Sequence, residues 1–147
     1  MAKVHAYLNF NGNCEEAFNF YKSVFNKEFI GIYRFGDMPQ DPNFTLADKD
    51  KNKIMHIGMP LNDHTMLMGS DCLESFSQKA IPGTTTYIMI DVDSVAEAEN
   101  IFNALSTNAQ NLEMPLEETF FAERFSSLVD QFGISWMIHF EGNKKMA

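Results

Sequence analysis

Hydrophobic and polar positions follow one another along this chain in an order that predicts the same structural unit twice. Asn13 and Ser94 each stand three residues before a glutamate, and apolar side chains then follow at helical spacing. This is the capping-box spacing of a helix start, so we expect two helices whose first turns lie 81 positions apart. A short segment rich in strand-forming residues precedes each of them, Val4 to Phe10 and Thr85 to Val92.

Three more strands are predicted after each helix. They comprise residues 28–35, 53–60 and 65–70 in the first half, and residues 110–114, 123–130 and 134–140 in the second, where Pro115 interrupts the pattern. The predicted fold class is therefore α+β, with two tandem β-α-β-β-β modules forming curved mixed sheets around a cavity. We expect a single domain over residues 1–147, with module one at about 1–80 and module two at about 81–147.

Composition and the lack of long apolar stretches predict the cellular location of the protein. The chain has 147 residues, enough for a fair core without disulfides, and its two cysteines are Cys14 and Cys72. The first strand begins too close to Met1 to leave room for a leader, and no apolar stretch approaches the roughly 20 residues of a membrane helix. We therefore expect a cytoplasmic protein with reduced thiols and no membrane partner. Cys14, at a helix start, is interpreted as an inert residue rather than an activated thiol.

Charge narrows the expected partners. Twenty acidic and eleven basic residues give a formal charge of −9. Such a chain repels a polyphosphate, so nucleic acid is not an expected partner. The longest irregular segment, residues 36–52, is a candidate flap over a pocket.

Several short motifs resemble those of a known family. The first half carries Tyr7-Leu8-Asn9-Phe10, Gly12-Asn13-Cys14-Glu15-Glu16-Ala17, Met55-His56 and Met66-Leu67-Met68-Gly69-Ser70-Asp71. The second half carries Met114-Pro115-Leu116, Glu118-Thr119-Phe120-Phe121-Ala122-Glu123-Arg124-Phe125, Asp130-Gln131-Phe132-Gly133 and Trp136-Met137. Together they resemble the PhnB-like family, also labelled demethylubiquinone methyltransferase-like, of the vicinal oxygen chelate superfamily that includes glyoxalase I and bleomycin resistance proteins. Phe121 and Ser126 depart from the family pattern, in which Trp and Gly are expected.

The resemblance implies paired β-α-β-β-β modules, which the repeat suggests independently, and a homodimer. It does not imply a methyltransferase mechanism for these residues. A methyltransferase on the usual doubly wound fold would show a strand, a Gly-rich turn and a helix that receives the cofactor. Gly12 is isolated before the first capping box, so methyltransferase activity is not expected.

Metal chemistry is a further implication of the superfamily, whose enzymes hold a divalent ion with four His, Glu or Gln side chains. The matching positions here are His5, Met68, Tyr87 and Met137. Only His5 suits such an ion, because Met and Tyr do not replace imidazole or carboxylate. We therefore expect no metal and no other cofactor, and a shifted strand register leaves a divalent metal as the alternative.

Strand alternation predicts the side chains that face the cavity. Successive side chains point to opposite faces, so the face of the first strand that carries Leu8 packs against the helix. The other face then contributes to a ligand-binding pocket of His5, Tyr7, Asn9, Tyr87, Met89, Met137 and His139. Possible pocket walls are Met68, Phe120, Phe121 and Arg124. Each of these residues could instead be a core residue or a dimer contact.

Two functions of different classes fit this pattern. The first is a protein that binds a small apolar or aromatic molecule without a metal. The second is an enzyme acting on a small carbonyl or phenolic compound, either through a metal or with His5 or His56 as general base.

Overall fold

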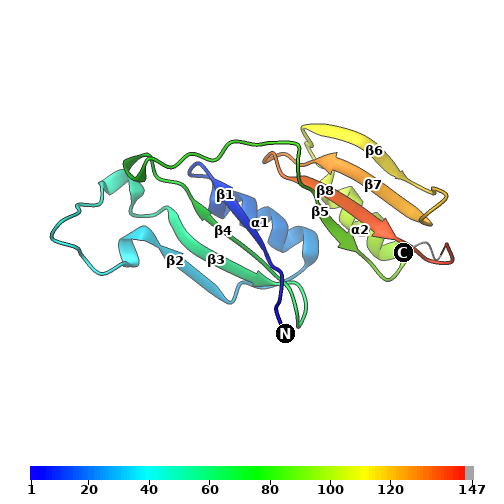
Figure 1. The fold of residues 1–147 in the computed structure, drawn as a ribbon, viewed down its shortest axis with the longest axis horizontal. Coiled ribbons are helices and arrows are strands. Elements are labelled where there is room, and N and C mark those ends of the chain that lie inside the picture. Colours follow the sequence, from blue (N-terminus) through cyan, green and yellow to red (C-terminus); the bar gives the residue numbers. More distant parts are fainter. Residues whose placement is uncertain (145–147) are drawn as a thin grey trace. The chain divides into compact units, whose positions relative to one another are not determined.

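The computed structural model describes residues 1–144 and divides into two compact units, Met1–Ile81 and Pro82–Ala147. In its described residues, each unit contains one α-helix and one four-stranded mixed sheet (Figure 1). The element order β-α-β-β-β occurs once in each unit, so the predicted fold class and the predicted repeat are confirmed.

Unit 1 (Met1–Ile81) places β1 at one edge of its sheet and β2 at the other. Its elements are β1 (Ala6–Phe10), α1 (Cys14–Phe25), β2 (Gly31–Arg34), β3 (Ile54–Pro60) and β4 (Met66–Asp71). The strand order is β1-β4-β3-β2, with β1 parallel to β4 and the other neighbours antiparallel. Register places Tyr7, Met68, Gly58 and Gly31 in one row across the sheet.

Unit 2 (Pro82–Ala147) repeats this arrangement. Its elements are β5 (Ile88–Asp91), α2 (Val95–Leu105), β6 (Asn111–Glu117), β7 (Arg124–Val129) and β8 (Ser135–Phe140). The strand order is β5-β8-β7-β6, with β5 parallel to β8. Register places Met89, Met137 and Ser127 in one row.

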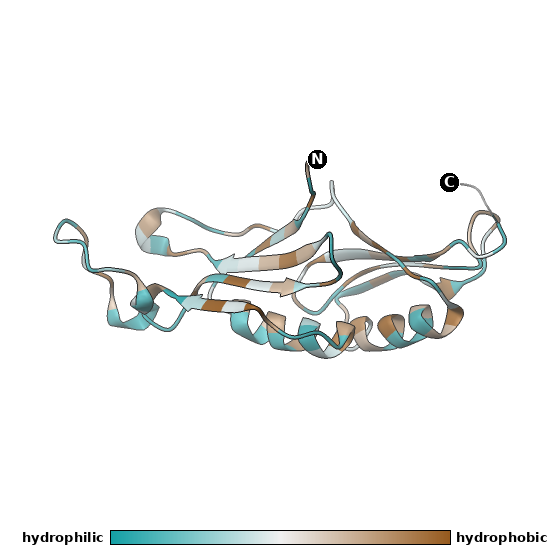
Figure 2. Ribbon diagram, turned by 90° about the horizontal axis from the view of Figure 1, so that it is seen from below, coloured by the Kyte–Doolittle hydropathy of each residue, from teal (hydrophilic) through white to brown (hydrophobic). Residues whose placement is uncertain are grey.

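Each helix covers one face of its own sheet (Figure 2), and the core of each unit lies between them. In unit 1, Phe18 of α1 packs so closely on Gly69 that a Cβ there would lie 2.6 Å from the Phe18 ring. In unit 2, Leu105 of α2 and Trp136 of β8 are fully buried. Leu8 is buried whereas Tyr7, its neighbour in β1, is 46% exposed, so the predicted alternation along the first strand is confirmed.

The start of α1 differs from the prediction. Asn13 is the N-cap residue, but its side chain makes no capping hydrogen bond. Instead Oδ1 of Asp71, at the end of β4, accepts the backbone N–H groups of Gly12 and Cys14 at 2.9 and 3.0 Å. The buried carboxylate binds the free donors of the helix start more strongly than the amide of Asn13 would. At the second helix the prediction is right, because Ser94 Oγ accepts the N–H of Glu97 at 3.1 Å.

Several strand boundaries also differ from the prediction, those of β6 and β2 among them. β6 continues through Pro115 to Glu117, because it is an edge strand and a missing N–H is tolerated there. The pairing of β6 with β7 shifts register on both sides of Met114, which accommodates the proline. β2 covers only Gly31–Arg34 of the predicted residues 28–35.

The candidate flap, residues 36–52, is largely irregular. It contains the short 3-10 helix Asp48–Asp50, and the isolated bridge between Asp41 and Phe44 closes a tight turn. The Phe44 ring packs on Phe76 at a centroid distance of 5.0 Å, which ties this segment to the rest of unit 1. Among residues 1–144, none of the helices has the length and apolar character needed to cross a membrane.

Candidate functional site

The free face of unit 1, which is the face of its sheet opposite α1, carries a cluster of aromatic rings. Tyr7 of β1, His56 of β3 and Tyr33 of β2 form it, and His56 lies in the middle. The His56 ring centroid is 5.7 Å from that of Tyr7 and 6.5 Å from that of Tyr33. Tyr7 Oη also lies 3.2 Å from His56 Nδ1. Because Tyr7 and Tyr33 are 46% and 53% exposed, these rings are available to a ligand.

Two glycines lie beside this cluster. Gly31 and Gly58 are register partners on β2 and β3. A Cβ on Gly31 would lie 3.1 Å from the Tyr33 ring, and a Cβ on Gly58 would lie 3.0 Å from the Met66 methyl group. The two glycines therefore let an aromatic ring and a thioether pack directly against the backbone of the sheet.

The other predicted pocket residues of unit 1 are held by their neighbours. His5 Nδ1 accepts the backbone N–H of Met66 at 3.0 Å, which makes this nitrogen part of the structure rather than a free base. Asn9 Oδ1 accepts the hydroxyl of Ser70 at 3.4 Å. Met68 is the register partner of Tyr7, so it lies on the same face. His5 is thus less suited than His56 to act on a ligand.

The free face of unit 2, opposite α2, carries a hydrogen-bonded polar cluster among thioethers. Glu113 Oε1 accepts the hydroxyl of Tyr87 at 2.7 Å and that of Ser127 at 3.0 Å. Met89 and Met137, register partners on β5 and β8, belong to the same face. The sequence predicts Tyr87, Met89 and Met137 here, but it predicts neither Glu113 nor Ser127.

A second polar pair lies further along this face. His139 Nδ1 is 2.9 Å from Asp91 Oδ1. The Phe121 ring stacks on the imidazole with an interplanar angle of 11°, and Phe125 meets it edge-on. The His139 side chain is 10% exposed and the Asp91 side chain 70% exposed, so the aromatic rings bury the imidazole while its carboxylate partner faces solvent.

The remaining predicted wall residues, in the segment before β7 and at its start, do not all lie on the free face of unit 2. Phe121 joins His139, whereas Phe120 is 80% exposed and contacts the Phe121 ring. Alternation along β7 places Arg124 on the face of the buried Ser126 and Leu128, opposite Ser127. The structure therefore brings Phe121, but not Arg124, to the free face of unit 2.

Cys14 does not offer a reactive thiol to either of these faces. Cys14 and Cys72 are free cysteines, and Cys14 is fully buried. Burial, followed by the nearby charge of Asp71, raises the pKa of the Cys14 thiol far above its ordinary value. The interpretation of Cys14 as an inert helix-start residue agrees with this environment.

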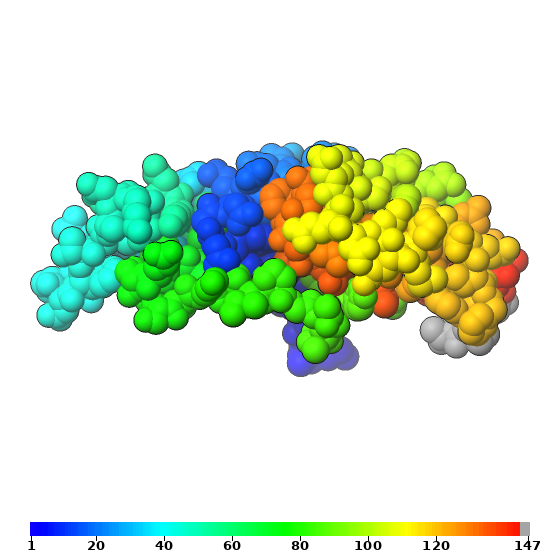
Figure 3. Space-filling model, turned by 90° about the horizontal axis from the view of Figure 1, so that it is seen from above, coloured from blue at the N-terminus to red at the C-terminus, as the bar shows by residue number. Residues whose placement is uncertain are grey.

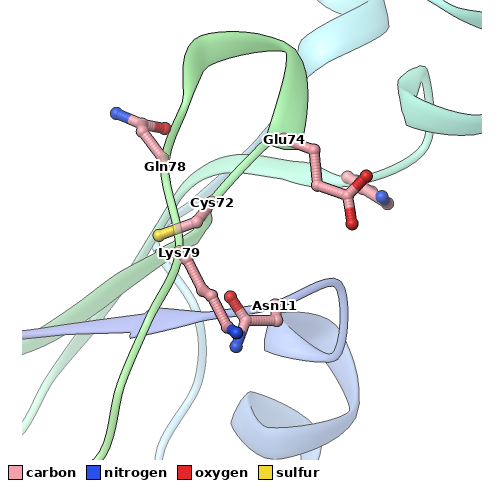
Figure 4. A pocket seen from close by; sticks show the side chains of 6 residues that line it. Asn11, Cys72, Glu74, Gln78 and Lys79 are labelled. Atoms are coloured by element: carbon pink, nitrogen blue, oxygen red, sulfur yellow. The ribbon is translucent and has the colours of Figure 1, made fainter.

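A polar pocket of about 240 Å³ lies elsewhere in unit 1 (Figure 4), and it contains none of the predicted site residues. It is lined by Asn11, Lys53, Cys72, Glu74, Gln78 and Lys79. The Asn11 amide bonds the backbone N–H and C=O of Ala80 at 2.8 and 2.9 Å. The segment after β4, green in Figure 3, is thereby held alongside the end of β1. This contact between the Asn11 side chain and the Ala80 backbone thus fixes one side of the pocket within unit 1.

The residues at the superfamily's metal positions do not fit a divalent ion. Met68 and Met137 offer thioethers, Tyr87 donates its hydroxyl to Glu113, and His5 uses Nδ1 to accept a backbone N–H. Within either unit, the described residues bring no three His, Cys, Asp or Glu side chains together as a metal site would require. These side chains therefore do not provide the ligand set of a divalent ion.

The fold of this chain is shared with a known class of proteins. The fold is that of the glyoxalase and bleomycin resistance superfamily; one such structure, a glyoxalase-related enzyme from Fulvimarina pelagi, has 17% identity and a TM-score of 0.60 over 95% of this chain and 88% of that chain. The chain belongs to the 3-demethylubiquinone-9 3-methyltransferase family, whose sequence profile matches residues 2–139. The predicted resemblance is confirmed.

Two relatives are similar over nearly their whole length. The crystal structure of protein PA1353 from Pseudomonas aeruginosa has 36% identity and a TM-score of 0.82, covering 96% of this chain and 98% of that chain. Protein YjdN from Escherichia coli is 29% identical in an alignment 143 residues long, which covers 90% of this chain and 91% of that protein.

Proposed function

We propose that this protein binds a small, largely apolar or aromatic molecule on the free face of its sheets, without a metal ion. The observation that carries the proposal is that these faces display uncovered aromatic and thioether side chains beside a few hydrogen-bonded polar groups. Tyr7, Tyr33 and Met89 are each about half exposed although each belongs to or adjoins a sheet. Apolar lining with few polar groups is the usual composition of a small-molecule site.

The metal-free part of the proposal rests on the donor set. Thioether and phenol groups at the family positions bind hard or borderline divalent ions poorly. Protein purified without chelator should therefore carry no stoichiometric transition metal. Elemental analysis that found close to one zinc, nickel or manganese per chain would contradict this part and would identify His5 as a ligand to re-examine.

The methyltransferase activity in the family's description is not part of the proposal. In a doubly wound methyltransferase the turn between a strand and a helix presents free backbone N–H groups to the cofactor. In the turn between β1 and α1, the N–H groups of Gly12 and Cys14 both donate to Asp71. This turn is therefore closed by the protein's own carboxylate.

Titration with N-phenyl-1-naphthylamine, a neutral aromatic probe whose fluorescence rises in apolar sites, tests the binding proposal. Met89→Asp places a charge on the free face of unit 2, and the desolvation of that charge should weaken probe binding by at least about tenfold. Met38→Asp is the matched control, because Met38 is also exposed but lies in the irregular segment after β2. Equal affinity of both variants and the parent protein would contradict the proposed location.

A second candidate function, general-base catalysis on a small carbonyl compound, is favoured by the Asp91 and His139 pair. Asp91 orients the imidazole through Nδ1 at 2.9 Å. The His139 side chain is 10% exposed, and because Nδ1 bonds to Asp91, Nε2 is the ring nitrogen left to take a proton. An imidazole held in this way by a carboxylate is a common general base.

Deuterium exchange tests this second candidate. In the proposed step His139 Nε2 takes a proton from the carbon next to a carbonyl, the electron pair moves to the carbonyl oxygen, and a deuteron from D₂O later returns to carbon. With 4-phenyl-2-butanone as probe, NMR should show exchange above the buffer rate for the parent protein and not for His139→Gln. Equal exchange in both samples would reject the candidate.

We also propose a homodimer in the cytoplasm. Apolar side chains remain exposed on edge strands, including Ile32 of β2 and Leu112 of β6, and a second copy could cover them. Light scattering at micromolar concentration measures the mass directly, and a monomer would contradict the proposed assembly.

A further inference from the structure

The polar cluster on the free face of unit 2 spans most of the sheet. Tyr87 directly precedes β5, Ser127 lies on β7 and Glu113 lies on β6, while the strand order is β5-β8-β7-β6. The Glu113 carboxylate therefore reaches from one edge strand over β7 towards the other edge. Its Oε1 atom holds both hydroxyl groups, at 2.7 Å from Tyr87 and 3.0 Å from Ser127.

The hydrogen-bond donors of this cluster are used within it, and its remaining acceptors determine what it can bind. A tyrosine and a serine hydroxyl each carry one hydrogen, and here both hydrogens point to Glu113 Oε1. The hydrogen bond to Glu113 also raises the pKa of Tyr87, as expected for a phenol that donates to a carboxylate. The cluster is left with acceptors, namely Glu113 Oε2 and the remaining lone pairs of the two hydroxyl oxygens. A ligand that bonds here must therefore donate.

The net charge of unit 2 also favours a ligand that donates hydrogen bonds. Unit 2 contains ten acidic and three basic residues, a formal charge of −7 out of −9 for the chain. Its two described basic side chains are already engaged: Arg124 Nη1 donates to the carbonyl of Glu123, and Lys144 pairs with Glu118 at 3.0 Å. Among the described residues, Glu113 thus has hydroxyl partners but no cationic one. The field of unit 2 attracts cations and repels anions.

From these observations we infer that the proposed site of unit 2 selects an organic cation, a protonated amine that carries an apolar or aromatic body. The ammonium group donates to Glu113 Oε2 and to the free lone pairs of Tyr87 and Ser127. The body packs on Met89 and Met137, whose flexible thioethers adapt to differently shaped ligands. This inference rests on the proposed binding function and adds the charge class of the ligand.

Three ligands that differ only in their polar group test the inference. They are 1-naphthylmethylamine, 1-naphthylmethanol and 1-naphthylacetate, each used to displace N-phenyl-1-naphthylamine from the protein. We expect the amine to bind about tenfold more tightly than the alcohol at low salt and the acetate to bind weakest. The preference for the amine should shrink as sodium chloride is added, because salt screens a partly exposed charge pair.

The variant Glu113→Gln removes the charge and keeps the shape. It should reduce the amine's affinity to within about threefold of the alcohol's, while the alcohol's own affinity changes by less than about threefold. Glu99→Gln is the matched control, because Glu99 is an exposed residue of α2 and its substitution removes the same charge from unit 2. A preference lost equally in both variants would overturn the assignment to the cluster, since it would reflect net charge alone.

The charge selection and the binding function can be refuted separately. Equal binding of the amine, the alcohol and the acetate would overturn the charge selection and leave the binding function standing. If neither the neutral probe nor any naphthyl ligand binds, the binding function fails and the selection fails with it. The salt dependence is measured on the unaltered protein, so the inference stays testable even if Glu113→Gln does not fold.

Discussion

Replacing Asp71 with asparagine tests the contact that joins α1 to its sheet. Asp71 is 3% exposed, and its carboxylate accepts three backbone N–H groups. Oδ1 binds those of Gly12 and Cys14 at 2.9 and 3.0 Å, and Oδ2 binds that of Ile54 at 2.8 Å. Asparagine keeps the shape but turns one acceptor oxygen into a donor. At least one buried N–H then faces another donor.

The loss in free energy of unfolding can be worked out from these three hydrogen bonds. A buried donor without a partner costs about 1–3 kcal/mol, and the loss of the charge weakens the remaining bonds by about 1–2 kcal/mol in all. We therefore expect Asp71→Asn to lower the free energy of unfolding by about 2–5 kcal/mol, a large share of the roughly 5–15 kcal/mol of a typical domain.

Urea unfolding followed by circular dichroism measures this loss. Asp63→Asn is the matched control, because Asp63 is exposed in the turn between β3 and β4 and should change stability by no more than about 0.5 kcal/mol. If Asp71→Asn is as mild as the control, the carboxylate does not hold the helix start and the reasoning is wrong.

Other substitutions test the two faces of the sheets. Leu8→Ala should cost about 2–5 kcal/mol through the cavity it leaves, whereas Tyr87→Ala should change stability by less than about 1 kcal/mol yet weaken probe binding; the reverse order in thermal melts and titrations would mean that the faces are exchanged. Gly69→Ala should cost about 1–3 kcal/mol in urea unfolding, because its Cβ would lie 2.6 Å from the Phe18 ring and 2.9 Å from the Leu8 carbonyl oxygen. Retained stability would show that Phe18 moves aside freely.

The repeat and the faces of its strands follow from local sequence signals. Ser94 and its glutamate mark α2 correctly, since a capping box involves only neighbouring residues. Alternation separates Leu8 from Tyr7, because side-chain direction in a strand depends only on the parity of the position. Both signals are short-range, and short-range signals can be read from one sequence.

The features that the sequence does not reveal depend on distant partners. Asp71 replaces the Asn13 side chain as the cap of α1, although it lies 57 positions from Cys14. Glu113 meets Tyr87 only because the strand order brings their long side chains together across the sheet. Pro115 reads as a strand break until β6 is known to be an edge strand. In each case the deciding contact or position is set by the tertiary structure.

Methionine methyl NMR most directly tests the central claim, that an apolar ligand binds on the free face of unit 2 without a metal. The chain has ten methionines, which can be labelled with ¹³C at the methyl group and titrated with N-phenyl-1-naphthylamine in the presence of EDTA. The aromatic ring of the probe should shift the Met89 and Met137 signals with the affinity measured by fluorescence, and the Met38 signal should stay in place. Shifts confined to other methionines, or shifts that arise only when a divalent metal replaces EDTA, would contradict the claim.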